Sequence, residues 1–283
     1  LLVSFGYTGY KNARYGRIEC HESITAFSRT ILLDAMHLAE QYGYQVLHGI
    51  VDSLWVQAVN PLVSPSKLAL IISKNTGVRL DVEAEYDWIV FLQSKHHDYG
   101  ALNRYYGRFT TAELKKRGIE IRQHNTPVFA RNMQKEMLRV FQQVRTKKDV
   151  LDNLNCAIEV VFNFLNRLIH RDVRTTDLLF TSRVSRSIKQ YKVNTFVKAA
   201  LQQNYDDGCL VQPGQTVEYI ICDQTHDSYK KKVCVKNRLS SDTCFDVSFY
   251  LQYLCRCAET VLVAFDISEE WLLEQFLRKE YSV

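Results

Sequence analysis

Apolar residues first follow a helical period over residues 22–42, where they recur at steps of three and four before Gly43. Residues 44–59 instead form two apolar runs that break at Asp52, a pattern that predicts a β-hairpin with an acidic tip. Further helices are predicted over residues 65–77, 129–144, 150–169, about 195–203 and 247–264, and further strands over residues 78–92, 104–109, 119–122 and 217–222.

The order of these elements predicts an α+β fold with a domain boundary near residue 126. Strands mixed with helices occupy residues 1–126, which we expect to form an antiparallel sheet, and residues 127–283 are mainly helical. Hydrophobic residues make up 46% of the 283 residues, so the chain can bury a substantial core and is not disordered.

Net charge and cysteine spacing bear on two questions: whether the protein binds a polyanion, and whether its cysteines form disulfides or a metal site. The net charge is 36 − 31 = +5, which permits a polyanionic partner without requiring one. The eight cysteines form no Cys-x-x-Cys pair, and Cys255 and Cys257 point to different faces of a predicted helix. Cys156 and Cys222 lie in apolar runs, so we expect them to be buried thiols.

The hydropathy of the chain and its first residue bear on the cellular compartment and on how the sequence begins. No signal peptide and no apolar run of membrane-spanning length occur, which favours a reducing cytoplasm. The sequence opens at Leu1 without a methionine, which indicates a cut, a split gene or a partial record.

Asp52 is the sharpest candidate for chemistry. A carboxylate at the tip of an apolar hairpin is exposed and rigidly held, as a divalent-cation site for phosphoryl transfer requires. The alternative is an ordinary turn aspartate. Upstream, residues 4–17 mix glycines, aromatic residues and three cations, which suits close approach, stacking and phosphate pairing. The alternative there is a glycine-rich loop on a basic surface.

Two other groups of titratable residues are weaker candidates. A row of carboxylates from Asp81 to Asp87, which includes Glu83 and Glu85, alternates along a predicted strand and would share one face, either near a metal or in solvent. His96-His97-Asp98 suggests a metal site, but adjacent histidines on a strand point to opposite faces, which favours a loop or strand end.

Several segments, taken in order, resemble the motifs of family B DNA polymerases. That family carries a Tyr-Gly-Tyr-x-x-Ala-Arg run, a palm helix, a Tyr-x-Asp-Thr-Asp-Ser hairpin, and Lys-Lys-Arg-Tyr-x-Gly, Lys-Gly-Ile-Glu, Arg-Arg-Asp-Thr-Pro and Tyr-Lys-Val-Asn segments. The counterparts here are residues 4–14, 48–53, 103–107, 117–120, 126–127, 191–194 and, for the final thumb helix, 261–265. The resemblance covers nearly the whole chain and implies a partial palm over residues 1–126, with the end of the fingers, and a thumb over residues 127–283.

The chain also departs from the family pattern. Ile50 stands at the first hairpin aspartate and Val51 at the threonine, so only the second aspartate is kept, as Asp52. Residues 102–103 replace the two lysines, and residues 123–125 read Gln-His-Asn for Arg-Arg-Asp. The asparagine of the family's Asn-Ser-x-Tyr-Gly motif, a region that checks the nascent base pair in relatives, is also missing. Fewer cations should weaken salt-dependent DNA binding. Together these features are most similar to the divergent second group of archaeal family B polymerases.

The resemblance implies DNA-directed DNA polymerase activity for the intact protein, in the cytoplasm of an archaeon at the nucleoid. Two Mg²⁺ ions, or Mn²⁺, would be held by Asp52 with Glu83 as a helper. The implied partners are primer–template DNA, deoxynucleoside triphosphates and an upstream polymerase portion with the other catalytic aspartate. Residues implied near the nucleotide or template are Ser4, Tyr7, Lys11 and Arg14, and those implied on the duplex are Arg104, Tyr105, Lys192 and Asn194.

Three functional readings therefore stand. The family's upstream Asp-x-x-Ser-Leu-Tyr-Pro motif is not in this sequence, so the chain alone is expected to be inactive. Ile50 motivates an alternative, a catalytically impaired DNA-binding or scaffold subunit derived from a polymerase. A third reading is an unrelated metal-dependent nuclease that uses Asp52 and the carboxylates of residues 81–87.

Overall fold

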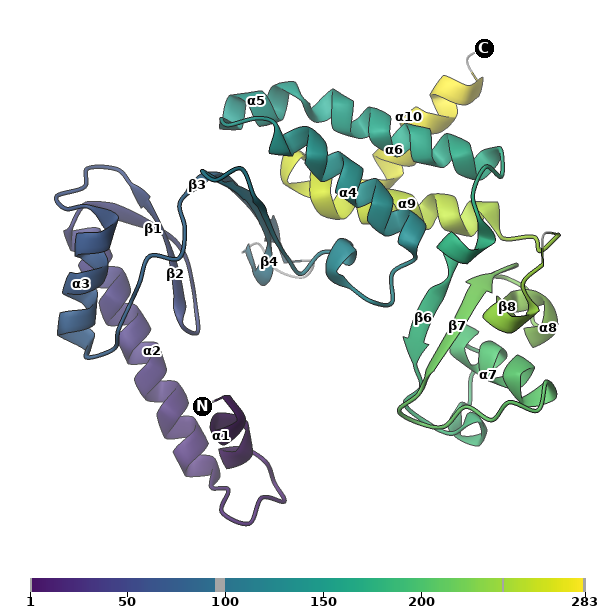
Figure 1. Ribbon diagram of the computed structural model, residues 1–283, viewed down its shortest axis with the longest axis horizontal. Helices are drawn as coiled ribbons and strands as arrows, with labels where there is room; N and C mark the ends of the chain where they lie inside the picture. The colour runs from purple at the N-terminus through teal and green to yellow at the C-terminus, as the bar shows by residue number, and fades with distance from the viewer. Residues whose placement is uncertain (1, 95–99, 241, 282–283) are drawn as a thin grey trace. The chain divides into compact units, whose positions relative to one another are not determined.

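The computed structural model describes residues 2–94, 100–240 and 242–281. Its contacts divide the chain into two compact units, unit 1 (Leu1–Glu85) and unit 2 (Tyr86–Val283). Both contain helices and small antiparallel sheets, so the predicted α+β class is confirmed (Figure 1). The division into units lies at residue 85, whereas the predicted palm–thumb boundary near residue 126 stays a prediction.

Unit 1 is a β-hairpin covered by helices. The antiparallel pair β1–β2 contacts α2, and α3 packs against α2, around a small core of Ala35, Ala39, Tyr44, Leu68 and Ile72. The elements are α1 (Leu2–Thr8), α2 (Ile18–Gln41), β1 (Tyr44–Ile50), β2 (Ser53–Ala58) and α3 (Pro65–Thr76).

Local signals place the ends of these elements as the sequence predicts. Gly43 has φ +84°, and a β-carbon there would lie 1.9 Å from the Asn60 carbonyl oxygen, so only glycine turns the chain from α2 into β1. The Ser64 hydroxyl accepts a hydrogen bond from the Lys67 amide at 3.4 Å and caps α3, which ends at the left-handed Gly77.

Unit 2 combines two three-stranded antiparallel sheets, in the orders β3-β4-β5 and β6-β7-β8, with a layer of long helices. Its strands are β3 (Tyr86–Gln93), β4 (Gly100–Phe109), β5 (Leu114–Arg117), β6 (Phe180–Arg183), β7 (Thr216–Ile221) and β8 (Val233–Val235). Its α-helices are α4 (Val128–Gln142), α5 (Lys147–Asp152), α6 (Leu154–Ile169), α7 (Phe196–Asp206), α8 (Tyr229–Lys232), α9 (Val247–Leu262) and α10 (Glu269–Tyr281). Single 3₁₀ turns are η1 (Glu120–Arg122), η2 (Thr175–Leu178), η3 (Ile188–Gln190), η4 (Lys236–Arg238) and η5 (Val263–Phe265).

Helix α9 lies at the centre of this layer, against α4, α6 and α10 (Figure 1). Two hydrogen bonds, one buried and one partly buried, join the first sheet to the helical layer and its loops. The Tyr106 hydroxyl donates to the Val261 carbonyl at 2.7 Å, and the Trp88 indole donates to the Val144 carbonyl at 3.0 Å. Because a buried donor without a partner is costly, these bonds fix how β3 and β4 sit on the helices.

Three predicted elements are corrected. Residues 78–85 form no strand, because the Leu80 amide donates to the Ser73 hydroxyl on α3 rather than to a strand partner. Residues 119–122 form the turn η1 instead of a strand. The helix predicted over residues 150–169 is two helices that break at Asn153, whose side-chain amide donates to the Asp149 carbonyl at 2.8 Å and competes with the helix. Helix α10 was not predicted.

The cysteines are free thiols throughout. Cys255 and Cys257 are both buried, since α9 is covered on opposite faces, and burial raises the pKa of Cys255 to about 12. The expectation of a buried Cys156 is wrong, because that side chain lies on the exposed face of α6, and Cys222 is half-buried. No helix in the described part of the chain is long and apolar enough to cross a membrane.

Candidate catalytic hairpin and nucleic-acid interface

The register of the β1–β2 hairpin places Asp52 at its tip. Ile50 pairs with Ser53, so Val51 and Asp52 form a two-residue turn. The Asp52 side chain is exposed, and the Ser53 hydroxyl donates to its Oδ1 at 3.3 Å. The predicted hairpin with an acidic tip is therefore confirmed: Asp52 presents a solvent-exposed carboxylate at the turn between two paired strands.

The turn itself is strained at Val51, which has φ +50°. A β-branched residue is disfavoured in the left-handed region, so this conformation persists because the strands on each side enforce it. The His48 and Trp55 rings, 5.3 Å apart, flank the turn from opposite strands. At Gly49 a β-carbon would lie 3.4 Å from the Met36 sulfur, so α2 approaches the hairpin closely.

The predicted row of carboxylates does not form. Asp81 and Glu83 lie in an extended connection without strand pairing, and Asp81 pairs with Arg79 at 3.0 Å. Asp87 lies in β3 and forms a largely buried ion pair with Arg108. Without a continuous strand, alternation does not bring these side chains to one face.

A magnesium site would therefore be only partly supplied by this chain. In the described residues no three His, Cys, Asp or Glu side chains gather as a metal site. Mg²⁺ is commonly held by one or two carboxylates with water and substrate phosphates. Asp52 fits one such ligand, and a role for Glu83 stays a prediction. His96-His97-Asp98 lies outside the described residues.

The loop between α1 and α2 is a series of tight turns. The amides of Tyr10, Ala13 and Gly16 each donate to the carbonyl three residues earlier. Lys11 and Arg14 project from this loop and are exposed, and the Arg14 guanidinium lies 5.4 Å from the Tyr15 ring centre.

Helix α1 carries the remaining predicted residues of this region. The Tyr7 side chain is exposed, and its hydroxyl accepts the Tyr15 amide at 3.4 Å. Phe5 stacks on His21 of α2 at 4.2 Å, which holds α1 to α2. Ser4 lies in α1, but its side chain is outside the described residues. Tyr7, Lys11 and Arg14 are thus brought together in one exposed segment.

The predicted DNA-binding residues of β4 differ in accessibility. Tyr105 is 4% exposed and lies 5.9 Å from the Phe91 ring, so its side chain supports the sheet. Arg104 is half-buried, and its Nε donates to the Gly118 carbonyl at 3.2 Å. Gly118 has φ +65°, and a β-carbon there would lie 2.2 Å from the Asn103 carbonyl oxygen. Glycine is thus required at position 118, directly after β5 ends beside β4.

A buried network that sequence reasoning missed follows this turn. The Gln134 side chain, 0% exposed in α4, accepts the Ile121 amide at 2.8 Å and donates to Glu120 Oε2 at 2.7 Å and to the Cys257 carbonyl at 2.6 Å. The Thr260 hydroxyl donates to the other Glu120 oxygen at 3.1 Å. The carboxylate of the Lys-Gly-Ile-Glu counterpart therefore ties η1 to α4 and α9.

The same turn gathers cations. Lys116 of β5 is half-buried, and burial, followed by the charges of Lys135 and Arg122, holds its pKa below the ordinary value. The bond between Ile121 and Gln134 explains the proximity, because Arg122 and Lys135 are their chain neighbours. Sequence analysis did not identify these three cations, because Arg122 is 6 residues after Lys116 and Lys135 is 13 residues after Arg122. The signal that the sequence offered was the basic run at residues 115–117.

In the second sheet region, Lys192 is exposed on the loop before α7. The Asn194 side-chain amide donates to the Asp227 carbonyl at 2.6 Å, and the Thr195 hydroxyl accepts the Lys198 amide at 3.2 Å and caps α7. Asn194 is thus committed to holding two loops together, while Lys192 is accessible to a ligand.

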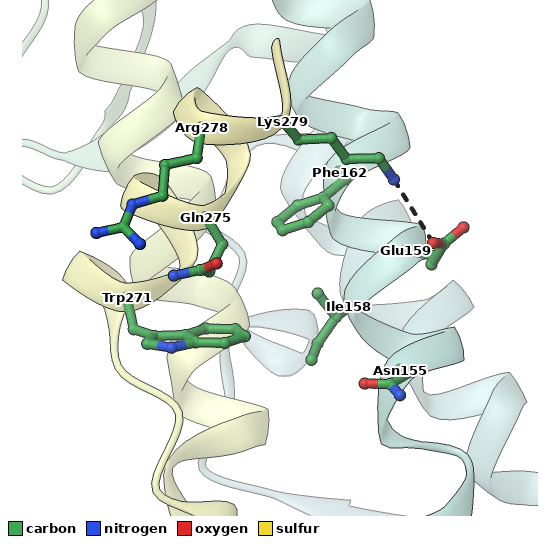
Figure 2. A pocket seen from close by; sticks show the side chains of 8 residues that line it. All are labelled: Asn155, Ile158, Glu159, Phe162, Trp271, Gln275, Arg278 and Lys279. Carbon is green, nitrogen blue, oxygen red and sulfur yellow. Dashed lines mark ion pairs between the residues drawn. The ribbon is translucent and has the colours of Figure 1, made fainter. Parts of the chain in front are cut away.

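A pocket of about 500 Å³ lies between α6 and α10 (Figure 2). Trp271 and Phe162 face it, and the Lys279 ammonium pairs with Glu159 at 3.6 Å on its rim. None of the residues predicted from the sequence lines this pocket.

The fold is that of a polymerase portion. The chain is similar to the structure of the family B DNA polymerase from Pyrobaculum calidifontis, with a TM-score of 0.64, 21% identity, and coverage of 91% of this chain and 32% of that one. The family model for DNA polymerase family B matches residues 3–265. The chain belongs to DNA polymerase family B.

The relatives are archaeal. The chain is 36% identical over 150 residues to DNA polymerase 2 of Saccharolobus solfataricus, covering 53% of this chain and 22% of the relative. It is 26% identical over 251 residues to DNA polymerase 1 of the same organism, covering 87% and 26%. DNA polymerase 2 of Aeropyrum pernix is 23% identical over 272 residues, covering 95% and 32%. The chain thus spans between a fifth and a third of these relatives.

Proposed function

We propose that this chain contributes the carboxyl-terminal palm and the thumb to a DNA-directed DNA polymerase. The observation that carries the proposal is the exposed Asp52 carboxylate at the tip of the hairpin, in a chain that matches family B over residues 3–265. An ordinary turn aspartate would not require the strained Val51 beside it, and such strain is concentrated at functional sites.

The reaction of the whole enzyme would be nucleotidyl transfer. The primer 3′-hydroxyl oxygen forms a bond to the α-phosphorus of a deoxynucleoside triphosphate, the bond to the bridging oxygen breaks, and pyrophosphate leaves. Divalent metal ions, Mg²⁺ or Mn²⁺, would lower the pKa of the hydroxyl and stabilise the developing negative charge. Asp52 would hold a metal at a fixed position, since the paired strands leave the tip little freedom.

A second carboxylate would come from an upstream portion of the polymerase. The first half of α2 supports this proposal: Ile24 and Phe27 are 42% and 72% exposed, although they continue the apolar stripe that buries Ala35. Such a face favours a polypeptide cover. The chain alone would therefore be inactive, because it lacks both the cover and the second carboxylate.

Cationic side chains would hold the nucleic acid. Lys11 and Arg14, together with the exposed Tyr7, suit the nucleotide or template, because cations pair with phosphate and aromatic faces stack on bases. Lys192 and Arg104 suit the duplex backbone, where contacts position DNA without reading its sequence. Tyr105 and Asn194 would support these contacts from within the fold rather than touch DNA.

Primer extension by the intact polymerase that contains this chain tests the proposal. Asp52→Asn keeps the shape of the side chain and removes its charge, and Asp81→Asn is a matched control, because Asp81 is an exposed carboxylate of the same unit paired only with Arg79. We expect Asp52→Asn to lower extension by about a hundredfold to a thousandfold in Mg²⁺, with Asp81→Asn unchanged. Equal activity of both variants would refute the role of Asp52.

A catalytically impaired DNA-binding subunit is the second candidate, favoured by Ile50 at the first aspartate position and by the lack of a three-ligand group among the described residues. It predicts no extension by the wild-type polymerase in Mg²⁺ or Mn²⁺ while primer–template remains bound. The nuclease reading is not favoured, because the carboxylates of residues 81–87 do not form one face.

A further inference from the structure

The turn from β5 to α4 concentrates three cations, Lys116, Arg122 and Lys135. Among the ion pairs of the described residues, none includes Lys116, Arg122 or Lys135. Glu120 is the only acidic residue between Lys116 and Arg122, and both its oxygens are bound on the inner side, by Gln134 and by Thr260 on α9. The cluster therefore repels itself in the free protein, and an anion would relieve this repulsion.

A fourth cation extends the cluster along α4. Arg131 lies one helical turn before Lys135, so the two side chains share a face of the helix. Arg131 is half-buried, and its Nε is enclosed without a hydrogen-bond partner.

The charge distribution favours a polyanion over a small anion. β5 is an edge strand, and its alternation places Lys115 and Arg117 on the face opposite to Lys116. The basic side chains of β5 thus lie on both faces of the strand, and Arg122 and Lys135 lie close to Lys116. Several separate cations suit the repeated phosphates of a nucleic-acid backbone better than a single small anion.

The position of the cluster in the sequence adds a second reason. Its members Lys116 and Arg122 precede and Lys135 follows residues 123–125, where Gln-His-Asn stands in place of the Arg-Arg-Asp of the segment that this chain resembles. We propose that Lys116, Arg122 and Lys135 form a phosphate-binding cluster for the nucleic-acid backbone, which replaces cations absent from residues 123–124. The proposal rests on the proposed function, because it assumes that this unit grips DNA.

Salt-dependent binding of a fluorescent primer–template duplex to the purified chain tests the cluster. Arg122→Gln/Lys135→Gln removes two exposed cations of the cluster. Lys147→Gln/Lys148→Gln, at the exposed start of α5, removes the same charge elsewhere in unit 2. Each cation on a phosphate adds about 0.9 to the slope of log affinity against log salt. We expect the cluster variant to lower that slope by about 1.5–2 and to weaken binding about tenfold to a hundredfold at ~0.1 M salt.

The possible outcomes of this binding experiment distinguish the proposed DNA grip from the proposed phosphate-binding cluster. No duplex binding by the wild-type chain would overturn the proposed DNA grip and the cluster together. Binding by the wild type with equal slopes for both double variants would overturn the cluster alone and leave the DNA grip in place. Competition by inorganic phosphate or a deoxynucleoside triphosphate at micromolar concentration would show a small-anion site and overturn the assignment to the backbone. Equal thermal unfolding midpoints of the three proteins establish that the variants are folded.

Discussion

Gln134 is the buried residue whose replacement has the largest expected effect on the described network. Gln134→Leu keeps the size of the side chain and removes its three hydrogen bonds of 2.6–2.8 Å. The Ile121 amide and the Cys257 carbonyl then lose their partner, and the Glu120 carboxylate loses one of two donors. Burial of an unsatisfied polar group costs about 1–3 kcal/mol.

These losses predict a large drop in stability. Since Glu120 is only half-buried, water can replace part of the lost donor there, and the leucine adds apolar contact. The net loss is therefore about 3–6 kcal/mol for unit 2. For a unit of this size, 1 kcal/mol corresponds to roughly 2–4 °C, so the midpoint should fall by roughly 10–20 °C.

Urea unfolding followed by circular dichroism at the helical band measures this loss, because the affected helices belong to unit 2. Gln252→Leu is the matched control: the same substitution at an exposed glutamine of α9, with an expected change within about 0.5 kcal/mol. If Gln134→Leu unfolds within about 1 kcal/mol of Gln252→Leu, the network does not stabilise the junction and the reasoning is refuted.

Three further substitutions test the turns and the charges. Gly118→Ala should destabilise unit 2 by about 2–4 kcal/mol in urea, because φ is +65° and the added carbon would lie 2.2 Å from the Asn103 carbonyl oxygen. Val51→Asn should stabilise unit 1 by about 1 kcal/mol in thermal unfolding, since asparagine tolerates φ +50° and the valine is 73% exposed. Lys135→Gln should raise the pKa of Lys116, measured by NMR titration, and stabilise the free chain at neutral pH by a few tenths of a kcal/mol.

The pH dependence of the last variant has a definite sign. The pKa of Lys116 is lowered in the folded chain and ordinary, 10.5, in the unfolded chain, so the unfolded state binds more protons between these two values. Burial of the charged Lys116, followed by the repulsion from Lys135 and Arg122, therefore destabilises the fold fully at neutral pH, and this destabilisation is relieved as pH rises through the folded pKa. The advantage of Lys135→Gln should disappear above pH 10.5; an advantage that is constant with pH would contradict the assignment to Lys116.

The other two predictions have equally direct contradictions. A Gly118→Ala chain as stable as wild type would mean that the turn after β5 relaxes without cost. A destabilised Val51→Asn chain would mean that the valine side chain makes a stabilising contact that outweighs its backbone strain. Asp52→Asn, a substitution at the neighbouring turn position, is the control for this measurement.

The sequence by itself determined the elements whose signals are local. The apolar period of residues 22–42, the cap at Ser64 and the glycines at 43 and 77 act within a few residues of one another, so helix α2, the hairpin and helix α3 were predictable. The exposed position of Asp52 followed in the same way, because a break between two apolar runs is a local pattern.

Only the tertiary structure decided which side chains meet. Glu120 and Thr260 are 140 residues apart, and Cys156 lies in an apolar run yet faces solvent, because burial depends on which face of α6 the other helices cover. The first part of the strand predicted over residues 78–92 failed for the same reason. The Leu80 amide bonds to Ser73 of α3, and the alternation of apolar residues cannot reveal that partner. Hydrogen-bond partners and neighbouring charges are set by packing between distant segments, so the network of Gln134 and the cluster of Lys116, Arg122 and Lys135 exist only once the chain has folded.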